Sequence, residues 1–178
     1  MRIAVFLDGA NFFFMQKDDL GWFADPKKII DYIESLYGSV EDAYYYIGQD
    51  SPPDIRQQAF LDALPMMGYA VVSKQIKTLF DEKTGNTKKK ANLDIEIVLD
   101  MFNTIDNYDL AVLISGDGDF ERALSLLKAR GKKFLVMATD KYIARELRAA
   151  AGKHYVNLEN IREDIEKETK AADLVENK

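Results

Sequence analysis

Three aspartates follow strand-like apolar runs, at positions that suit a metal site. Asp8 follows the run Ile3–Leu7, and Asp117 and Asp119 follow the run Leu110–Ser115. In an open α/β sheet, ligands bind in the crevice at the carboxyl ends of neighbouring strands. Carboxylates gathered in such a crevice repel one another and lose hydration, so they usually persist because a cation or a reaction needs them. We therefore interpret these aspartates as ligands of a divalent metal.

The glycines around Asp117 support this interpretation. Gly116 and Gly118 permit a tight strand-to-helix turn, from which Asp117 and Asp119 can reach one small volume. A nucleotide-binding glycine loop fits poorly, because Glu121 stands where the third glycine belongs and the acids would repel a pyrophosphate. A calcium-binding EF-hand also fails, because its required glycine and bidentate glutamate are replaced by arginine and lysine.

Asp94 is a further candidate ligand. It lies in the predicted helix Leu93–Ile105, on one stripe with Met101 and Ile105. A carboxylate on a buried stripe is costly unless it is paired or binds a cation. The alternative is an acid that the helix dipole favours in the first turn. Asp100 lies off this stripe and is the weaker candidate.

Several of these residues also have a plain structural interpretation. Asp8 could bond to its own backbone in a turn. Asn11 and Asp119 could each cap a helix. Asn11 could instead orient a water or a phosphate oxygen. Spacing alone leaves these alternatives open.

Composition excludes several classes of site. The chain has 178 residues, of which 47% are hydrophobic and 30% charged, as expected for one globular domain. It has no cysteine and a single histidine, His154, so thiol catalysis, thiolate metal sites and multi-histidine zinc sites are not expected. No apolar stretch approaches the roughly 18 residues of a membrane helix, and an acid comes too early for a signal peptide. We expect a cytoplasmic protein with no membrane association.

The charge distribution gives one argument against nucleic-acid binding and one for it. A formal net charge of −6 argues against a strong nucleic-acid binder. However, the basic residues are clustered, which would suit a phosphate backbone, although solvated surface explains the clusters equally well. The two clusters are Lys83, Lys88, Lys89 and Lys90, and Lys128, Arg130, Lys132 and Lys133.

Strand-like and helical patterns alternate along the whole chain, which predicts a parallel sheet covered on both faces. The predicted strands are Ile3–Leu7, Ala43–Ile47, Tyr69–Ile76, Leu110–Ser115, Phe134–Ala138 and Tyr155–Leu158. The predicted helices are Pro26–Tyr37, Pro53–Met67, Leu93–Ile105, Phe120–Arg130, Tyr142–Ala151 and a charged terminal helix, Ile161–Ala172. The polar stretch Asp81–Lys90 is predicted to be a mobile loop.

Three ordered motifs resemble the NYN domain, and most closely the bacterial LabA-like branch of the PIN-like nuclease superfamily. They are Val5-Phe-Leu-Asp8-Gly-Ala-Asn11, Lys90-Ala-Asn-Leu-Asp94 and Ser115-Gly-Asp117-Gly-Asp119-Phe120. The later segment Arg145-Glu-Leu-Arg also resembles that branch. The resemblance implies an NYN/PIN-like domain over residues 1–161, followed by a charged C-terminal helix or tail over 162–178.

The resemblance also implies a three-layer α/β/α fold, with a central parallel sheet ordered 3-2-1-4-5. It implies an acidic pocket that binds Mg²⁺ or Mn²⁺ and cuts RNA. Carried over by position, the pocket is Asp8, Asp94, Asp117 and Asp119, with Asn11 and Ser115 as polar support. Relatives often carry an acid where this chain has Gly152-Lys153, which could alter the site.

The leading hypothesis is metal-dependent hydrolysis of RNA phosphodiester bonds, since carboxylate oxygens suit a hard cation. We expect Asp8 and Asp117 to be direct ligands, while Asp94 and Asp119 bind a second ion or position water. Lys88, Lys89 and Lys90 could follow the RNA backbone without reading its sequence.

Two other functions remain open. The first is a module that binds RNA, a nucleotide or a protein partner with little or no catalysis. The second is a metal-dependent phosphatase, although Ala10 replaces the second aspartate expected there.

Three aromatic runs could stack on unpaired bases, although packing is the favoured interpretation, above all for the tyrosines within a strand. The runs are Phe12–Phe14, Trp22–Phe23 and Tyr44–Tyr46.

Overall fold

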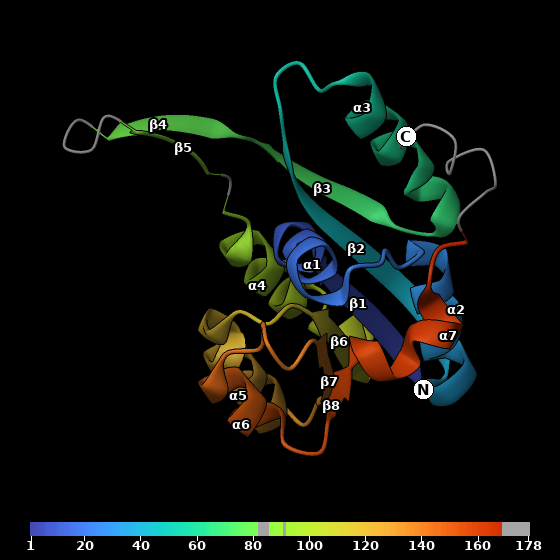
Figure 1. Cartoon of the computed structure of the whole chain (residues 1–178). Coiled ribbons are helices and arrows are strands. Elements are labelled where there is room, and N and C mark those ends of the chain that lie inside the picture. Colours follow the sequence, from blue (N-terminus) through green and yellow to red (C-terminus); the bar gives the residue numbers. More distant parts are fainter. Residues whose placement is uncertain (82–85, 91, 169–178) are drawn as a thin grey trace.

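A six-stranded parallel sheet forms the middle layer of the fold (Figure 1). The computed structural model describes residues 1–81, 86–90 and 92–168, with the side chains of 77–90 left undescribed. The sheet order is β3-β2-β1-β6-β7-β8, and every neighbouring pair is parallel. This confirms the predicted order 3-2-1-4-5, with the short last strand added at the edge. The strands are β1 (Arg2–Asp8), β2 (Ser39–Gln49), β3 (Ala70–Gln75), β6 (Leu110–Ile114), β7 (Lys133–Ala138) and β8 (Tyr155–Asn157).

Helices cover both faces of this sheet, which confirms the three-layer prediction. They are α1 (Gly9–Met15), α2 (Pro26–Tyr37), α3 (Ile55–Ala63), α4 (Asp94–Asn103), α5 (Glu121–Ala129), α6 (Arg145–Ala151) and α7 (Arg162–Ile165). Shorter helical turns are the π-helix η1 (Gln16–Leu20) and the 3-10 turns η2 (Pro65–Met67), η3 (Ile105–Asn107), η4 (Gly118–Phe120) and η5 (Leu158–Ile161). Among the helices that the structure describes, none is long and apolar enough to cross a membrane.

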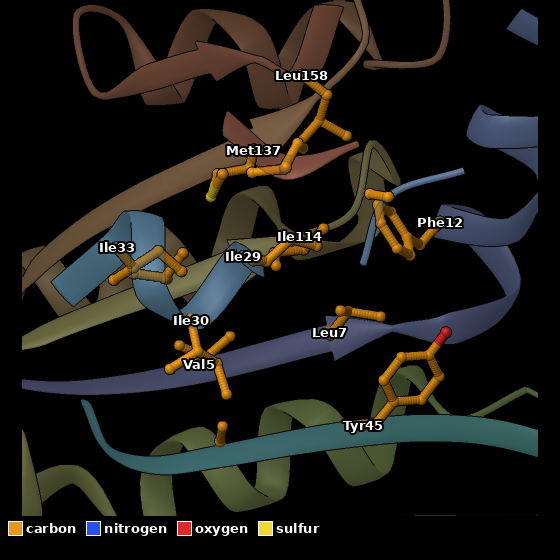
Figure 2. Close-up of a cluster of buried hydrophobic side chains, with 14 of the residues drawn as sticks. Val5, Leu7, Phe12, Ile29, Ile30, Ile33, Tyr45, Ile114, Met137 and Leu158 are labelled. Carbon is orange, nitrogen blue, oxygen red and sulfur yellow. The ribbon is translucent and has the colours of Figure 1, made fainter. Parts of the chain in front are cut away.

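Alternation along β1 divides the apolar core into two clusters. Ile3, Val5 and Leu7 point into one cluster, whereas Ala4 and Phe6 point into the other. The first cluster packs against α1 and α2, and Figure 2 shows strand residues and α2 isoleucines meeting there. The second cluster packs against α4, α5 and α6. Apolar side chains therefore cover both faces of β1, so a charged group at its carboxyl end has little water beside it.

The sheet reverses its direction of growth between β1 and β6. The chain adds β2 and β3 on one side of β1, and later adds β6, β7 and β8 on the other. Leu7 pairs in register with Ile114, so the residues that follow them, Asp8 and Ser115, leave adjacent strands side by side. Ligands bind at this switch point in open α/β sheets.

Four predicted elements differ from the structure. The predicted helix Pro53–Met67 is the shorter α3 followed by the 3-10 turn η2, and the predicted helix Tyr142–Ala151 begins only at Arg145. The stretch Asp81–Lys90 is not a simple loop, because β4 (Lys77–Asp81) pairs antiparallel with β5 (Asn86–Lys90) and the hairpin extends away from the sheet (Figure 1). Residues 82–85 lie outside the described part. The polar sequence concealed the hairpin because the hydrogen bonds of a β-ladder come from the backbone and need no apolar side chains.

The predicted terminal helix is also too long. Helix α7 ends at Ile165, and the backbone N–H of Lys167 then donates to the carbonyl of Phe23 (2.8 Å). Glu166 also forms an isolated β-bridge with Ala24. The chain after α7 therefore bonds to the loop before α2, and the helix does not continue. Residues 169–172 of the prediction lie outside the described residues.

Candidate metal centre

Three carboxylates converge at the switch point. Asp94, Asp117 and Asp119 each offer one oxygen, and these three oxygens lie within 4.8 Å of one another. Oxygens that bind one Mg²⁺ ion at about 2.1 Å lie up to about 4 Å apart, so a small closure would complete the set. The oxygen-only chemistry of these ligands also suits a hard cation. The cluster therefore fits a single Mg²⁺ or Mn²⁺ ion.

Two separate segments of the chain carry these three residues. Asp94 begins α4, directly after the segment that follows the β4–β5 hairpin. Asp117 and Asp119 lie in the turn from β6 into η4, where the Asp117 Oδ1 atom accepts the backbone N–H of Asp119 (3.0 Å). Asp119 does not cap the next helix, because the N-cap of α5 is Phe120. Its carboxylate remains exposed at the cluster.

Asp8 lies near the cluster and is buried, with 9% of its surface exposed. Its Oδ1 atom accepts the backbone N–H of Asn11 (3.1 Å), and its Oδ2 atom accepts the hydroxyl of Ser115 (3.0 Å). Burial raises the pKa of Asp8, and the charges of Asp94 and Asp117 raise it further, against the two hydrogen bonds. The structure thus brings Asp8 within electrostatic reach of the cluster, although its oxygens are not part of the three-aspartate group.

Asn11 and Ser115 tie the two strand ends together. The Asn11 Oδ1 atom accepts the backbone N–H of Gly116 (2.8 Å), and the Ser115 hydroxyl oxygen accepts the backbone N–H of Asp117 (3.2 Å). The N-cap of α1 is Asp8, so the helix-cap interpretation of Asn11 is wrong. Both side chains instead position the turn that carries Asp117.

Both glycines of this turn lie against the segment that leads into α6. A Cβ atom on Gly116 would collide with the carbonyl oxygen of Tyr142. A Cβ atom on Gly118 would collide with the carboxylate of Glu146, which comes from the first turn of α6. The backbone of the segment that leads into α6 thus fixes glycine at position 116, whereas at position 118 the end of the Glu146 side chain would have to shift.

Glu146 is an acid near the site that the sequence did not single out. Its carboxylate lies against Gly118, between the two aspartates of the turn. The only signal in the sequence was its place in the Arg145-Glu-Leu-Arg segment. Gly152 and Lys153 lie at the other end of α6, where they line a small cavity of about 300 Å³ with Lys133 at the start of β7. The departure from the family pattern at these positions is therefore remote from the aspartates.

Asp100 has a structural role. Its Oδ2 atom accepts the hydroxyl of Tyr46 (3.0 Å), a bond that links α4 to β2. It is not a member of the three-aspartate group. This bond holds the helix that begins with Asp94 against the sheet.

The predicted lysines lie on β5, close in sequence to the cluster. Lys88, Lys89 and Lys90 pair with Leu79, Thr78 and Lys77 of β4. Lys90 precedes Asp94 by four residues, so the hairpin leads directly toward the first ligand. Their side chains lie outside the described part, and their contact with RNA stays a prediction.

Comparisons with known proteins concern the family and the fold of this chain. A sequence model of the NYN domain matches residues 2–159. The chain is 48% identical over 168 residues to the "Low amplitude and bright protein LabA" of Synechococcus elongatus, covering 93% of this chain and 88% of that protein. A crystal structure of a protein of unknown function from Vibrio parahaemolyticus superposes with a TM-score of 0.74 at 23% identity, covering 93% of this chain and 96% of the other. The similarity to the Vibrio structure concerns the fold alone.

Proposed function

The chain belongs to the NYN domain family, in the PIN-like nuclease superfamily, and we propose that it is a metal-dependent ribonuclease. The observation that carries the proposal is the group of three carboxylate oxygens within 4.8 Å, at the switch point of the sheet. Paired or clustered acids at such a point are expensive to maintain without a cation. Mg²⁺ and Mn²⁺ are the proposed ions.

Each residue of the site has a distinct proposed role. Asp94, Asp117 and Asp119 hold the cation, and the buried carboxyl of Asp8 lies beside them, where a bound cation would favour its charged form. Such a cation would make a coordinated water more acidic and would stabilise the charge that develops on the phosphate. Asn11 and Ser115 keep the β6 turn fixed, so the carboxylates need little rearrangement when substrate binds.

RNA is the proposed substrate because the family acts on nucleic acid and because the Lys88–Lys90 segment adjoins the site. These lysines would bind phosphates and position the strand without selecting a sequence. Binding of this kind weakens steeply with salt. The net charge of −6 predicts that affinity away from this segment is low.

The test is cleavage of a labelled single-stranded RNA in Mn²⁺, in Mg²⁺ and in a chelator. Asp117→Asn removes a ligand charge while keeping an acceptor for the N–H of Asp119, so it should abolish cleavage in a folded protein. Asp54→Asn is the matched control, because Asp54 caps α3 in the same way (2.7 Å to the N–H of Gln57) but lies outside the cluster. Equal cleavage by wild type and Asp117→Asn would exclude this site.

A second candidate is an NYN module that binds RNA, nucleotide or a protein partner without efficient catalysis. The net charge of −6 favours this candidate, because a negatively charged protein repels the RNA polyanion that a nuclease must bind. A metal-induced rise in melting temperature without cleavage of any RNA would support this candidate over the nuclease.

A further inference from the structure

A small basic cavity lies at the opposite end of the sheet from the three aspartates. Its volume is about 300 Å³, and it lies where β7 begins and where α5 and α6, which pack against each other, both end (Figure 1). Lys133, the first residue of β7, pairs with Leu110 at the start of β6, whereas the turn that carries Asp117 follows the end of β6. At about 3.3 Å per residue, β6 alone separates the two places by about 13 Å. The basic cavity is therefore distinct from the candidate metal centre.

Four lysines from three segments of the chain line this cavity, and no acid among the described residues lines it. The lysines are Lys128, Lys132, Lys133 and Lys153. None of them forms an ion pair with another described residue. The acid that Lys132 reaches electrostatically, Asp109, is already paired with Arg2 (3.0 Å). In a chain with a net charge of −6, such an uncompensated group of positive charges favours an anion.

The two helix ends account for only part of this positive charge. Lysines interact favourably with the dipole at the C-terminus of a helix. This explains Lys128 in the last turn of α5, and Lys153, which follows Gly152 at the end of α6. Lys132 and Lys133 lie outside the helices, at the start of β7, so the dipole does not explain them.

The carbonyl oxygens at the end of α6 are already engaged, which lowers their repulsion of an anion. The carbonyl of Ala151 accepts the backbone N–H of His154 (2.9 Å), and the carbonyl of Gly152 accepts the guanidinium of Arg148 (2.9 Å). The same guanidinium lies over the ring of Tyr155, 4.4 Å from its centroid. These contacts hold a further positive charge, that of Arg148, next to the cavity.

Contacts within the protein hold two of the polar side chains of the lining. The Nζ atom of Lys132 donates to the carbonyl of Tyr108 (2.7 Å), which leaves two further N–H donors on that ammonium. The ring of His154 packs edge-on against Phe134, with centroids 5.8 Å apart, and offers a ring N–H. The other three lysines are exposed and free to turn toward a ligand. The cavity thus combines fixed donors with adaptable ones.

We propose that the basic cavity binds the phosphate group of a small phosphate ester, of the size of a mononucleotide. A phosphate group carries about two negative charges and three acceptor oxygens, so it can engage several lysines at once. A carboxylate carries one charge and would leave most of the repulsion among the lysines in place. A volume of about 300 Å³ lies at the lower end of the range of about 300–1,000 Å³ for small-molecule sites, which favours a small ligand.

The test uses adenosine 5′-monophosphate as the probe and adenosine as the same ligand without its phosphate. Both are titrated in a chelator, so that no metal at the aspartates binds phosphate. His154 is the single histidine of the chain, so the NMR signals of its ring protons report on this cavity directly. Lys133→Gln and Lys153→Gln each remove one charge at an exposed position of the lining. Lys27→Gln, at an exposed lysine of α2 outside the lining, changes the net charge equally and is the matched control.

We expect the monophosphate to shift the His154 signals until they saturate, and adenosine to leave them unchanged. Lys133→Gln and Lys153→Gln should each weaken binding about 2- to 5-fold, and Lys27→Gln should leave it unaltered. Unshifted His154 signals would overturn the proposal, and so would an equal loss in all three variants, which would show general charge attraction only. Single-stranded RNA that shifts these signals at a lower phosphate concentration than the monophosphate would assign the cavity to an RNA backbone and overturn the small ligand. The assay needs neither metal nor cleavage, so its outcome is independent of the proposed ribonuclease function.

Discussion

Replacing Asp117 by asparagine should change stability in opposite directions with and without metal. The Asp117 carboxylate has neighbours in Asp94 and Asp119, with oxygens within 4.8 Å, so its charge is opposed from two sides. It also accepts the backbone N–H of Asp119, a bond that the amide oxygen of asparagine can keep. The substitution therefore removes repulsion and a metal ligand without removing the turn.

The size of both effects follows from the geometry. Two unit charges about 5 Å apart in water repel by about 1 kcal/mol, so relief of two such pairs stabilises the metal-free protein by about 1–2 kcal/mol at low salt. For a domain of this length, each kcal/mol shifts the melting temperature by about 2–4 °C, which gives a rise of about 2–8 °C. Saturating metal at about 100 times its Kd stabilises the wild type by about 2.7 kcal/mol, and the variant should lose most of this gain.

The assay is thermal unfolding in a chelator and in Mn²⁺, followed by circular dichroism. Asp54→Asn is the control, since it changes a helix-capping aspartate outside the cluster and should alter neither the metal-free melting temperature nor the Mn²⁺-induced rise. A lower melting temperature for Asp117→Asn in chelator, or a Mn²⁺-induced rise as large as that of wild type, would refute the reasoning.

Three further predictions concern the frame of the site. Gly116→Ala should destabilise the fold by about 1–3 kcal/mol because its Cβ collides with the Tyr142 carbonyl, and a melting temperature equal to that of wild type would contradict this packing. Burial, together with two neighbouring acids, raises the pKa of Asp8, so folding without metal favours the protonated form. Its stabilising contribution is full below the unfolded pKa of about 4 and is lost as the pH rises through the folded value. Urea titrations across this pH range should show that the stability of wild type, relative to Asp8→Asn, falls as the pH rises. A difference that does not vary with pH would exclude the shift. Tyr46→Phe should cost about 1 kcal/mol, since Asp100 loses the hydroxyl at 3.0 Å, and urea unfolding that matches wild type would show that this bond does not hold α4.

The sheet was predictable because its strands are continuous apolar runs. β1 and β6 are buried on both faces, and such strands stand out even without alternation. The four aspartates were predictable for a related reason, since three follow these runs and Asp94 begins the next amphipathic helix. The pocket of Asp8, Asp94, Asp117 and Asp119 was implied by the resemblance to the NYN domain, as was the strand order that brings Asp8 and Asp117 to adjacent strand ends.

Other features depend on contacts that no local pattern contains. The bond from Gly116 to Asn11 joins residues 105 positions apart, and nothing near Asn11 distinguishes it from a helix cap. The β4–β5 hairpin is held by backbone pairing between polar strands, which hydrophobic periodicity does not register. The early end of α7 is decided by bonds to the loop before α2, which compete with continuation of the helix.

The three aromatic runs contain both buried and exposed rings. The sequence favoured packing for all three runs, and Phe12, Trp22, Tyr45 and Tyr46 are indeed buried. Neighbouring positions differ because α1 presents only one side to the core, so Phe13 and Phe14 are left outside. Sequence alone could not tell which rings the helix would expose, because the start and orientation of α1 were not predicted.

The most direct test of a metal site is a crystal grown or soaked in Mn²⁺, with data collected for anomalous scattering. We predict a peak coordinated by oxygens of Asp94, Asp117 and Asp119, near the buried Asp8, that disappears in Asp117→Asn. Crystals of the folded protein with no anomalous density among these aspartates at millimolar Mn²⁺, or with density only elsewhere, would contradict the account.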